Sequence, residues 1–292
     1  MHQYLRAVGF SEIKSKKQIR DLLNDLVIDS NRKEYIDSED GGVMVEYSKN
    51  YCPTCGVTLR GSYLENNELT LDFYYPFAIS EKVSTSEKVS VERHAATESL
   101  AGLTEDYRVG VTLIFYVQNC INVMKNQISE ELDFENLKKD ICFSALSLEG
   151  TIMLPIKKDP KQKEQLLKAS ADRNKRIIAA KNGDEEAIEQ LTLEDIDTYS
   201  AVSRRILTED VFTLVDSYLM PYGVECDQYS ILAEIEEFRL EKNSLSGEEV
   251  YVLCLSCNGL PITVCINRKD LLGEPEIGRR FRGNIWLQGE IV

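Results

Sequence analysis

The stretch that decides the fold is VYVLCLSC-NG-LPITVCIN, residues 250–267, near the carboxyl end of the chain. Two apolar runs flank Asn258-Gly259, a dipeptide that favours the tight type I′ turn between antiparallel strands. Further strand-like runs lie at 211–219, 231–240 and 281–291. Five strands in about eighty residues predict a small β-barrel-like region over residues 211–292.

The amino-terminal half shows both strand and helix patterns. Alternation at 43–47, 57–64 and 68–75 predicts neighbouring antiparallel strands, and the uniformly apolar run 109–118 predicts a central strand. Residues 141–156 read as a hairpin that turns near Glu149-Gly150. A helix is predicted over 15–29, because Ser15 and Gln18 form a capping box ahead of an apolar stripe.

The composition changes after Pro160. Residues 161–207 are rich in helix formers and in charge. We therefore expect three parts: an amino-terminal α+β region at 1–158, a charged helical insert at 159–210, and the β-rich region at 211–292. The predicted fold class is α+β with mainly antiparallel sheets.

Charge and cysteine content restrict the function classes. The 292 residues carry a formal net charge of -15, which opposes attraction to nucleic-acid phosphates and to anionic membrane surfaces. The amino terminus lacks a signal-peptide pattern, and the run at 109–118 is too short to span a bilayer. The sequence predicts a cytoplasmic protein with no nucleic-acid or membrane partner, whose eight cysteines are reduced thiols.

Two cysteine pairs resemble halves of a zinc site. Cys52 and Cys55 have the spacing of a zinc-knuckle turn, and Cys254 and Cys257 repeat it downstream. The second pair lies within a predicted strand, where positions three apart point to opposite faces. We expect ordinary structural cysteines and no cofactor, with a shared four-cysteine zinc site as the alternative. A thioredoxin-like site is disfavoured because a strand pattern, and no helix, follows Cys55.

A few histidine and acidic residues could bind a metal ion or take part in acid-base catalysis. The chain holds two histidines, of which only His94 lies well inside it, and Glu92 would share a strand face with it. Glu225 and Asp227 form one acidic pair among many in an acidic chain. Both sets are interpreted first as solvated surface groups. The lysines and arginines of the insert are likewise interpreted as a solvated helix face that docks on the acidic remainder.

The best candidate for a binding site is the carboxy-terminal ladder GRRFRGNIWLQG, residues 278–289. Alternation places Arg280, Arg282, Asn284 and the sole tryptophan, Trp286, on one face. Arginines beside an indole can hold a carboxylate or phosphate and stack on a planar ring. The alternative is a structural ladder in which the arginines pair with nearby glutamates and cover Trp286.

The segments YLRAVGF (4–10) and INRKDLLGEPEIGRRFRGNIWLQGEI (266–291) carry a family resemblance. They resemble an uncharacterised family of full-length proteins from anaerobic Gram-positive bacteria, classed as a domain of unknown function. The resemblance implies no activity, cofactor or catalytic residue.

Two functional hypotheses follow. The first is a non-catalytic binding or regulatory protein that takes an anionic small molecule or a protein partner. The second is a hydrolase or transferase that acts on an anionic small molecule held by Arg280 and Arg282, with carboxylates such as Asp227 as the reacting groups.

Overall fold

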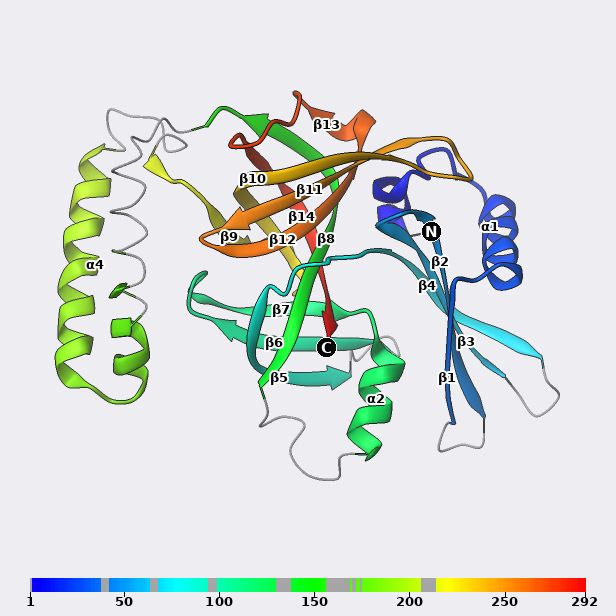
Figure 1. Cartoon of the computed structure of the whole chain (residues 1–292), viewed down its shortest axis with the longest axis horizontal. Helices are drawn as coiled ribbons and strands as arrows, with labels where there is room; N and C mark the ends of the chain where they lie inside the picture. The colour runs from blue at the N-terminus through cyan, green and yellow to red at the C-terminus, as the bar shows by residue number, and fades with distance from the viewer. Residues whose placement is uncertain are drawn as a thin grey trace.

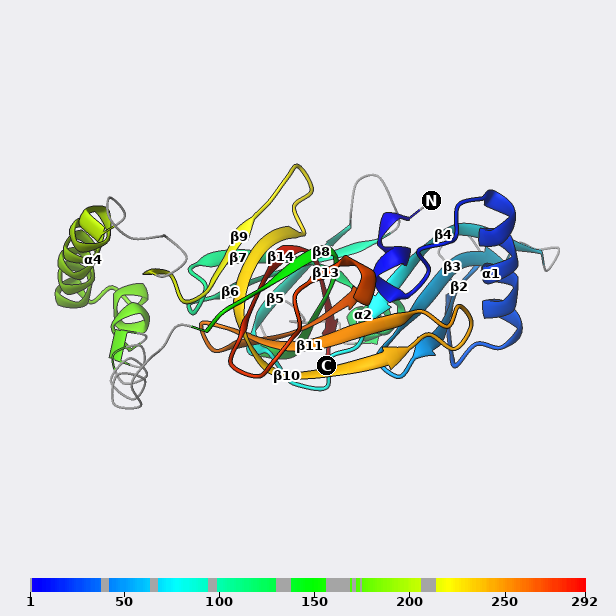
Figure 2. The same ribbon diagram turned by 90° about the horizontal axis from the view of Figure 1, so that it is seen from above.

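The computed structural model describes residues 2–37, 42–63, 68–93, 99–129, 138–155, 169, 172–173, 175–205 and 214–292. Two β-sheets dominate it, with α1 at one end of the molecule and α4 at the other in both views (Figures 1 and 2). The predicted α+β class, with mainly antiparallel sheets and a helical insert, is confirmed. None of the described helices is long and apolar enough to cross a membrane.

Sheet A is built from the amino-terminal part of the chain. Its strands follow one another in the order β1 (Arg32–Asp37), β2 (Val43–Cys52), β3 (Cys55–Tyr63) and β4 (Leu69–Ala78), all antiparallel. The strands predicted at 43–47, 57–64 and 68–75 therefore exist and pair as expected. Residues 64–67, between the last two of them, lie outside the described part.

Sheet B takes strands from both sides of the insert. Within the described ranges it contains ten strands. They are β5 (Thr85–Arg93), β6 (Leu100–Asp106), β7 (Val111–Val117), β8 (Lys138–Met153), β9 (Tyr218–Pro221), β10 (Gln228–Lys242), β11 (Glu249–Cys257), β12 (Leu260–Asn267), β13 (Leu271–Leu272) and β14 (Arg280–Ile291). The predicted hairpin of β11 and β12 is present, with Asn258 at φ 52° and Gly259 at φ 82° in its turn.

Sheet B closes into a ring through its two long strands, β8 and β14. These two pair along their length, while the other edge of β8 pairs with β5 at 138–141 and with β12 at 144–147. The other edge of β14 pairs with β10 and then with β7. Two circuits of strands result, β8-β12-β11-β10-β14 and β8-β5-β6-β7-β14, which share the β8–β14 ladder. The carboxy-terminal strands therefore complete their ring only with β8, which precedes the insert.

One apolar core fills the inside of sheet B. Phe281, Ile285 and Leu287 point into it, on the face opposite Arg282, as the alternation of β14 predicts. Gly102 on β6 leaves the space that the ring of Phe115 occupies, because a Cβ there would overlap that ring. Packing of this density makes the interior sensitive to single added methyl groups.

Residues 141–156 do not form the predicted hairpin. Residues 141–153 belong to β8, which continues through Glu149-Gly150 without a turn and ends at Met153. Gly150 lies opposite Gly283 of β14, and a Cβ at Gly150 would meet the ring of Phe281. The glycine thus makes room for an aromatic side chain inside the ring, which a turn signal in the sequence cannot reveal.

Short helices complete the structure. The 3-10 helix η1 (Gln3–Val8) and α1 (Lys16–Ile28) precede sheet A, and α1 begins with the predicted capping box of Ser15 and Gln18. Helix α2 (Cys120–Ser129) follows β7, and the 3-10 helix η2 (Arg268–Asp270) follows β12.

The insert is helical at 175–181 and in α4 (Glu185–Arg205). Arg173 and Arg176 pair with Glu194 of α4, and Lys181 pairs with Glu105 of β6 at 2.7 Å. The basic residues described here therefore meet acidic groups in the insert and on sheet B. Residues 156–168 and 206–213 lie outside the described part, so the three-part division at 158 and 210 stays a prediction.

Candidate functional site

A pocket of about 410 Å³ lies beside β8 and β14. We call it the arginine pocket. Its lining consists of Glu149, Gly150, Thr151, Ser230, Asp270, Leu272, Arg282, Gly283 and Asn284. Side-chain hydroxyl, amide, guanidinium and carboxylate groups therefore meet in one space, as in sites that fix the orientation of a small polar ligand.

A β-bulge shapes this pocket. The register between β14 and β8 shifts between Gly283 and Ile285, so Asn284 lies at the irregularity. Its Nδ2 donates to Glu149 Oε1 at 3.0 Å. Bulges redirect side chains and often accompany binding sites. Here the bulge brings the amide of one strand to the carboxylate of the other.

The four residues predicted for the ligand site separate into two groups. Arg282 and Asn284 both line the arginine pocket. The Arg280 guanidinium instead donates to the carbonyl oxygens of Leu154 and Val215 at 3.2 and 3.0 Å, and burial lowers its pKa. Arg280 is thus used to hold the chain at the two ends of the insert, outside the pocket.

Trp286 also lies outside the arginine pocket. Its ring packs against those of His2, Tyr4 and Tyr116, with centroid distances of 4.9, 5.3 and 5.2 Å. Its Nε1 donates to Asp227 Oδ2 at 2.7 Å. Aromatic rings therefore cover Trp286, where the structural-ladder alternative had placed the arginines, because the amino-terminal segment with η1 packs on this part of β14. Asp227 faces the indole and is not among the pocket lining.

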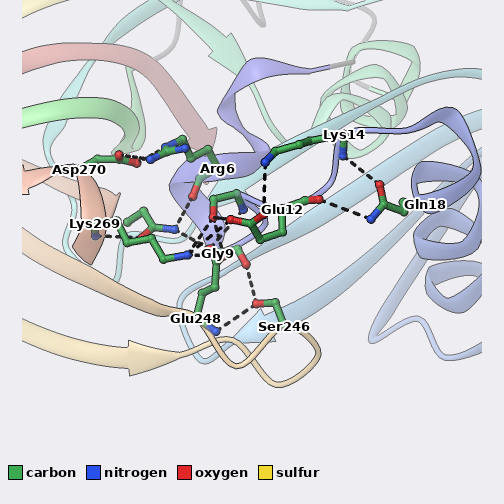
Figure 3. A network of polar contacts seen from close by, with 11 residues as sticks. Arg6, Gly9, Glu12, Lys14, Gln18, Ser246, Glu248, Lys269 and Asp270 are labelled. Atoms are coloured by element: carbon green, nitrogen blue, oxygen red, sulfur yellow. Dashed lines mark hydrogen bonds and ion pairs between the residues drawn. The ribbon is translucent and has the colours of Figure 1, made fainter.

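A polar network holds one wall of the arginine pocket in place (Figure 3). Arg6 of η1 donates from Nε and from a terminal nitrogen to the two carboxylate oxygens of Asp270, both at 2.5 Å. This paired contact fixes the geometry of the carboxylate. Because Asp270 closes η2, the amino-terminal segment determines where that wall of the pocket lies.

Glu248 is the centre of the same network. Ser11 Oγ, Lys269 Nζ and Asn267 Nδ2 donate to it at 2.5, 2.9 and 2.7 Å. Burial acts to raise the pKa of Glu248, but these hydrogen bonds outweigh it and hold that pKa below its usual value. The carboxylate thus ties the segment after η1 to the residues that carry η2.

The two cysteine pairs do not come together. Cys52 and Cys55 lie opposite each other at the β2–β3 turn, where Cys55 contacts the thiols of Cys52 and Cys265. Cys254 is half-buried on β11, and Cys257 belongs to the core of sheet B. Among the described residues, no group of three or more His, Cys, Asp or Glu side chains is placed to hold a metal ion. His94, the remaining imidazole candidate, lies outside the described residues.

Sequence reasoning missed a set of buried polar residues between the two sheets. Glu46, Arg60 and Tyr75 come from β2, β3 and β4, and each is at most 4% exposed. Arg60 donates to Glu46 at 3.3 Å, and the Tyr75 hydroxyl donates to Glu46 at 2.6 Å. The alternation of β2 and β3 does place Glu46 and Arg60 at positions that share a face. This alternation is the same whether the polar face is exposed to water or packed against a second sheet. The sequence therefore could not show that the face is buried.

A protein-family model matches almost the entire chain. Residues 5–289 match the family described as "Domain of unknown function, E. rectale Gene description (DUF3881)". Comparisons with curated proteins and with solved structures found no match. The match extends over nearly the whole length and includes most of the two segments, 4–10 and 266–291, that carry the resemblance. The chain belongs to this family, whose function is unknown.

Proposed function

We propose that the protein is a non-catalytic binding protein whose arginine pocket takes a small zwitterion with the chemistry of an α-amino carboxylate. The observation that carries this proposal is the presence of Arg282 and Glu149 in one lining. A guanidinium recognises a carboxylate, and a carboxylate recognises an ammonium group. The hydroxyls of Ser230 and Thr151 add donors and acceptors beside them.

The charge of the lining favours a zwitterion over the simple anion expected from the sequence. Arg6 pairs with Asp270, and the same lining contains the guanidinium of Arg282 and the carboxylate of Glu149. A ligand with only negative charge would be repelled by Glu149. A zwitterion can pair its carboxylate with Arg282 and its ammonium group with Glu149.

The same contacts favour binding over catalysis. Asp227, the carboxylate considered for a hydrolase or transferase, accepts the indole hydrogen bond of Trp286. We further propose a cytoplasmic location. It is supported by the eight cysteines, all of them free thiols, since reduced cysteines are characteristic of that compartment.

Isothermal titration calorimetry tests the proposal. The probes are L-alanine, L-glutamate and L-lysine, each compared with its N-acetyl and its carboxamide derivative. We expect a parent amino acid to bind and both derivatives to bind at least about tenfold more weakly, because each has lost one of the two charges. Arg282→Gln should abolish binding. Arg239→Gln, an exposed position elsewhere on β10, is the matched control and should leave binding unchanged.

Two results would refute this function. If N-acetyl derivatives bind as tightly as the parent amino acids, the pocket selects anions and Glu149 plays no part. If none of the probes binds at millimolar concentration, the pocket does not take this class of ligand.

A further inference from the structure

The face of sheet A that meets sheet B is polar, although it is almost entirely buried. Strand pairing places Ser48, Thr58 and Tyr75 side by side across β2, β3 and β4. Glu46 and Arg60 form the next row. Ser48 and Thr58 are 3% and 1% exposed, and Arg60 is fully buried. A buried polar surface requires explanation, because its groups lose water and must find partners.

The charged groups of this face compensate each other. Arg60 donates to Glu46, Tyr75 donates to the same carboxylate, and the Arg60 guanidinium lies 5.0 Å from the ring centre of Phe73. The charge of this row is therefore balanced within the protein. The row of Glu46 and Arg60 therefore presents no net charge to a ligand that lies beside it.

Next to these rows is a pocket of about 330 Å³, which we call the inter-sheet pocket. Ser48, Asn50 and Thr58 of sheet A contribute to its lining, together with Gln118, which directly follows β7 of sheet B. Ser48 and Thr58 share a hydrogen bond of 2.9 Å, and the Gln118 amide donates to Gln288 Oε1 at 2.7 Å. These contacts fix the polar side chains before any ligand arrives, which lowers the entropic cost of binding.

Aromatic rings form another part of the same lining. Tyr75 and Phe77 are two residues apart on β4 and so share a face. A Cβ at Gly56, opposite Phe77 on β3, would overlap the Phe77 ring, so the glycine lets this ring lie across its neighbouring strand. Flat apolar surfaces of this kind suit the face of a planar ring.

An ion pair joins the two sheets at this pocket. Arg32 of β1 lies 3.8 Å from Glu290 of β14, both side chains are partly exposed, and both contribute to the lining. Asn31, which is exposed, accepts the backbone N–H of Asn50 through its Oδ1 at 2.5 Å. The entrance therefore has a balanced ion pair and an amide, and it gives no preference for a charged ligand.

From these contacts we infer that the inter-sheet pocket is a second binding site, for an uncharged nitrogen heterocycle of purine type. The side-chain amide of Asn50 carries a donor and an acceptor together, which matches the edge of such a ring, while Tyr75 and Phe77 contact its face. Its balanced charges disfavour an ion. A volume of about 330 Å³ lies in the range of small-molecule sites.

The test is calorimetry of the full chain with adenine and hypoxanthine, and with adenosine to separate base from nucleoside recognition. Wild type should bind at least one of the three. Asn50→Ala should raise its Kd about fivefold, the effect of one lost hydrogen bond. Asn182→Ala, an exposed asparagine of the insert, is the matched control and should leave Kd unchanged. Arg282→Gln should also leave Kd unchanged, because that residue belongs to the other pocket.

Hydrogen exchange of the wild-type protein gives a second readout that does not depend on a variant. The bound base should slow exchange in peptides from β2 and β3, residues 43–63, without changing residues 228–232 of β10 beside the arginine pocket. The inference is wrong if none of the three probes binds at millimolar concentration. It is also wrong if Arg282→Gln, and not Asn50→Ala, weakens their binding, or if protection appears only at 228–232. If amino acids do not bind, the proposal for the arginine pocket is wrong, but the test of the inter-sheet pocket with these bases is unaffected.

Discussion

Arg60 and Glu46 pair across β3 and β2 at 3.3 Å, with side chains 0% and 5% exposed. Taking both charges out of water costs free energy that their attraction only partly returns. The pair therefore contributes little net stability compared with an apolar pair of the same size, but the loss of one partner leaves a buried charge. Its position beside the inter-sheet pocket fits a role in keeping that face polar.

The first prediction follows from the difference between removing both charges and removing only one of them. Arg60→Met alone should lower the free energy of unfolding by about 3 to 5 kcal/mol, because Glu46 keeps its charge without a cation. Arg60→Met with Glu46→Leu should cost clearly less than the single change. Urea unfolding followed by circular dichroism measures both. A double variant less stable than Arg60→Met would show that the two charges do not depend on each other.

The second prediction concerns the interior of sheet B. Gly102→Ala should destabilise the protein by about 1 to 3 kcal/mol or more, because the added methyl group overlaps the ring of Phe115. In a Phe115→Leu background the same change should cost much less. Unfolding free energies of the four proteins form a double-mutant cycle. Additive effects would mean that the two residues are not in contact.

The third prediction is a pH dependence at His2, whose ring packs on Trp286. Burial lowers the pKa of His2 from 6.5 to about 4. Between these two values the unfolded chain binds a proton that the folded protein does not, so stability falls as the pH drops through this window. The loss should be on the order of 1 kcal/mol, because the ring is partly exposed.

His2→Gln is the control, since glutamine does not titrate. Carboxylates elsewhere in the protein also titrate toward pH 4, so the informative quantity is the difference in stability between wild type and His2→Gln, measured at pH 7 and at pH 4.5. Trp286 fluorescence reports unfolding in both proteins. Equal losses of stability in the two proteins would rule out His2 as the source.

The fourth prediction addresses metal. Cys254 is half-buried on β11 and Cys257 lies in the core of sheet B, whereas Cys52 and Cys55 are in sheet A, so the four thiols are not placed to share one zinc ion. Purified protein should carry far less than one zinc per chain and keep its thermal midpoint in a strong chelator. Stoichiometric zinc whose removal unfolds the protein would contradict this arrangement.

Local signals in the sequence predicted the local structure well. The Asn258-Gly259 turn requires positive φ at both residues, and it is where the sequence placed it. The Ser15–Gln18 capping box starts α1, and alternation along β14 separates the inward Phe281, Ile285 and Leu287 from the outward Arg282. These features depend on neighbours in sequence or on the two-residue period of a strand, so no knowledge of the fold was needed.

The sequence by itself thus predicted the strands at 43–47, 57–64 and 68–75, the hairpin at Asn258-Gly259, the capped helix, the helical insert and the outward placement of Arg282. Only the tertiary structure decided which partner each face meets. Sheet B closes through β8 and β14, more than 120 positions apart in sequence, and the amino-terminal aromatic rings cover Trp286. The polar face of Glu46 and Arg60 is buried for the same reason: a strand's alternation fixes which side chains share a face, while burial depends on what packs against that face.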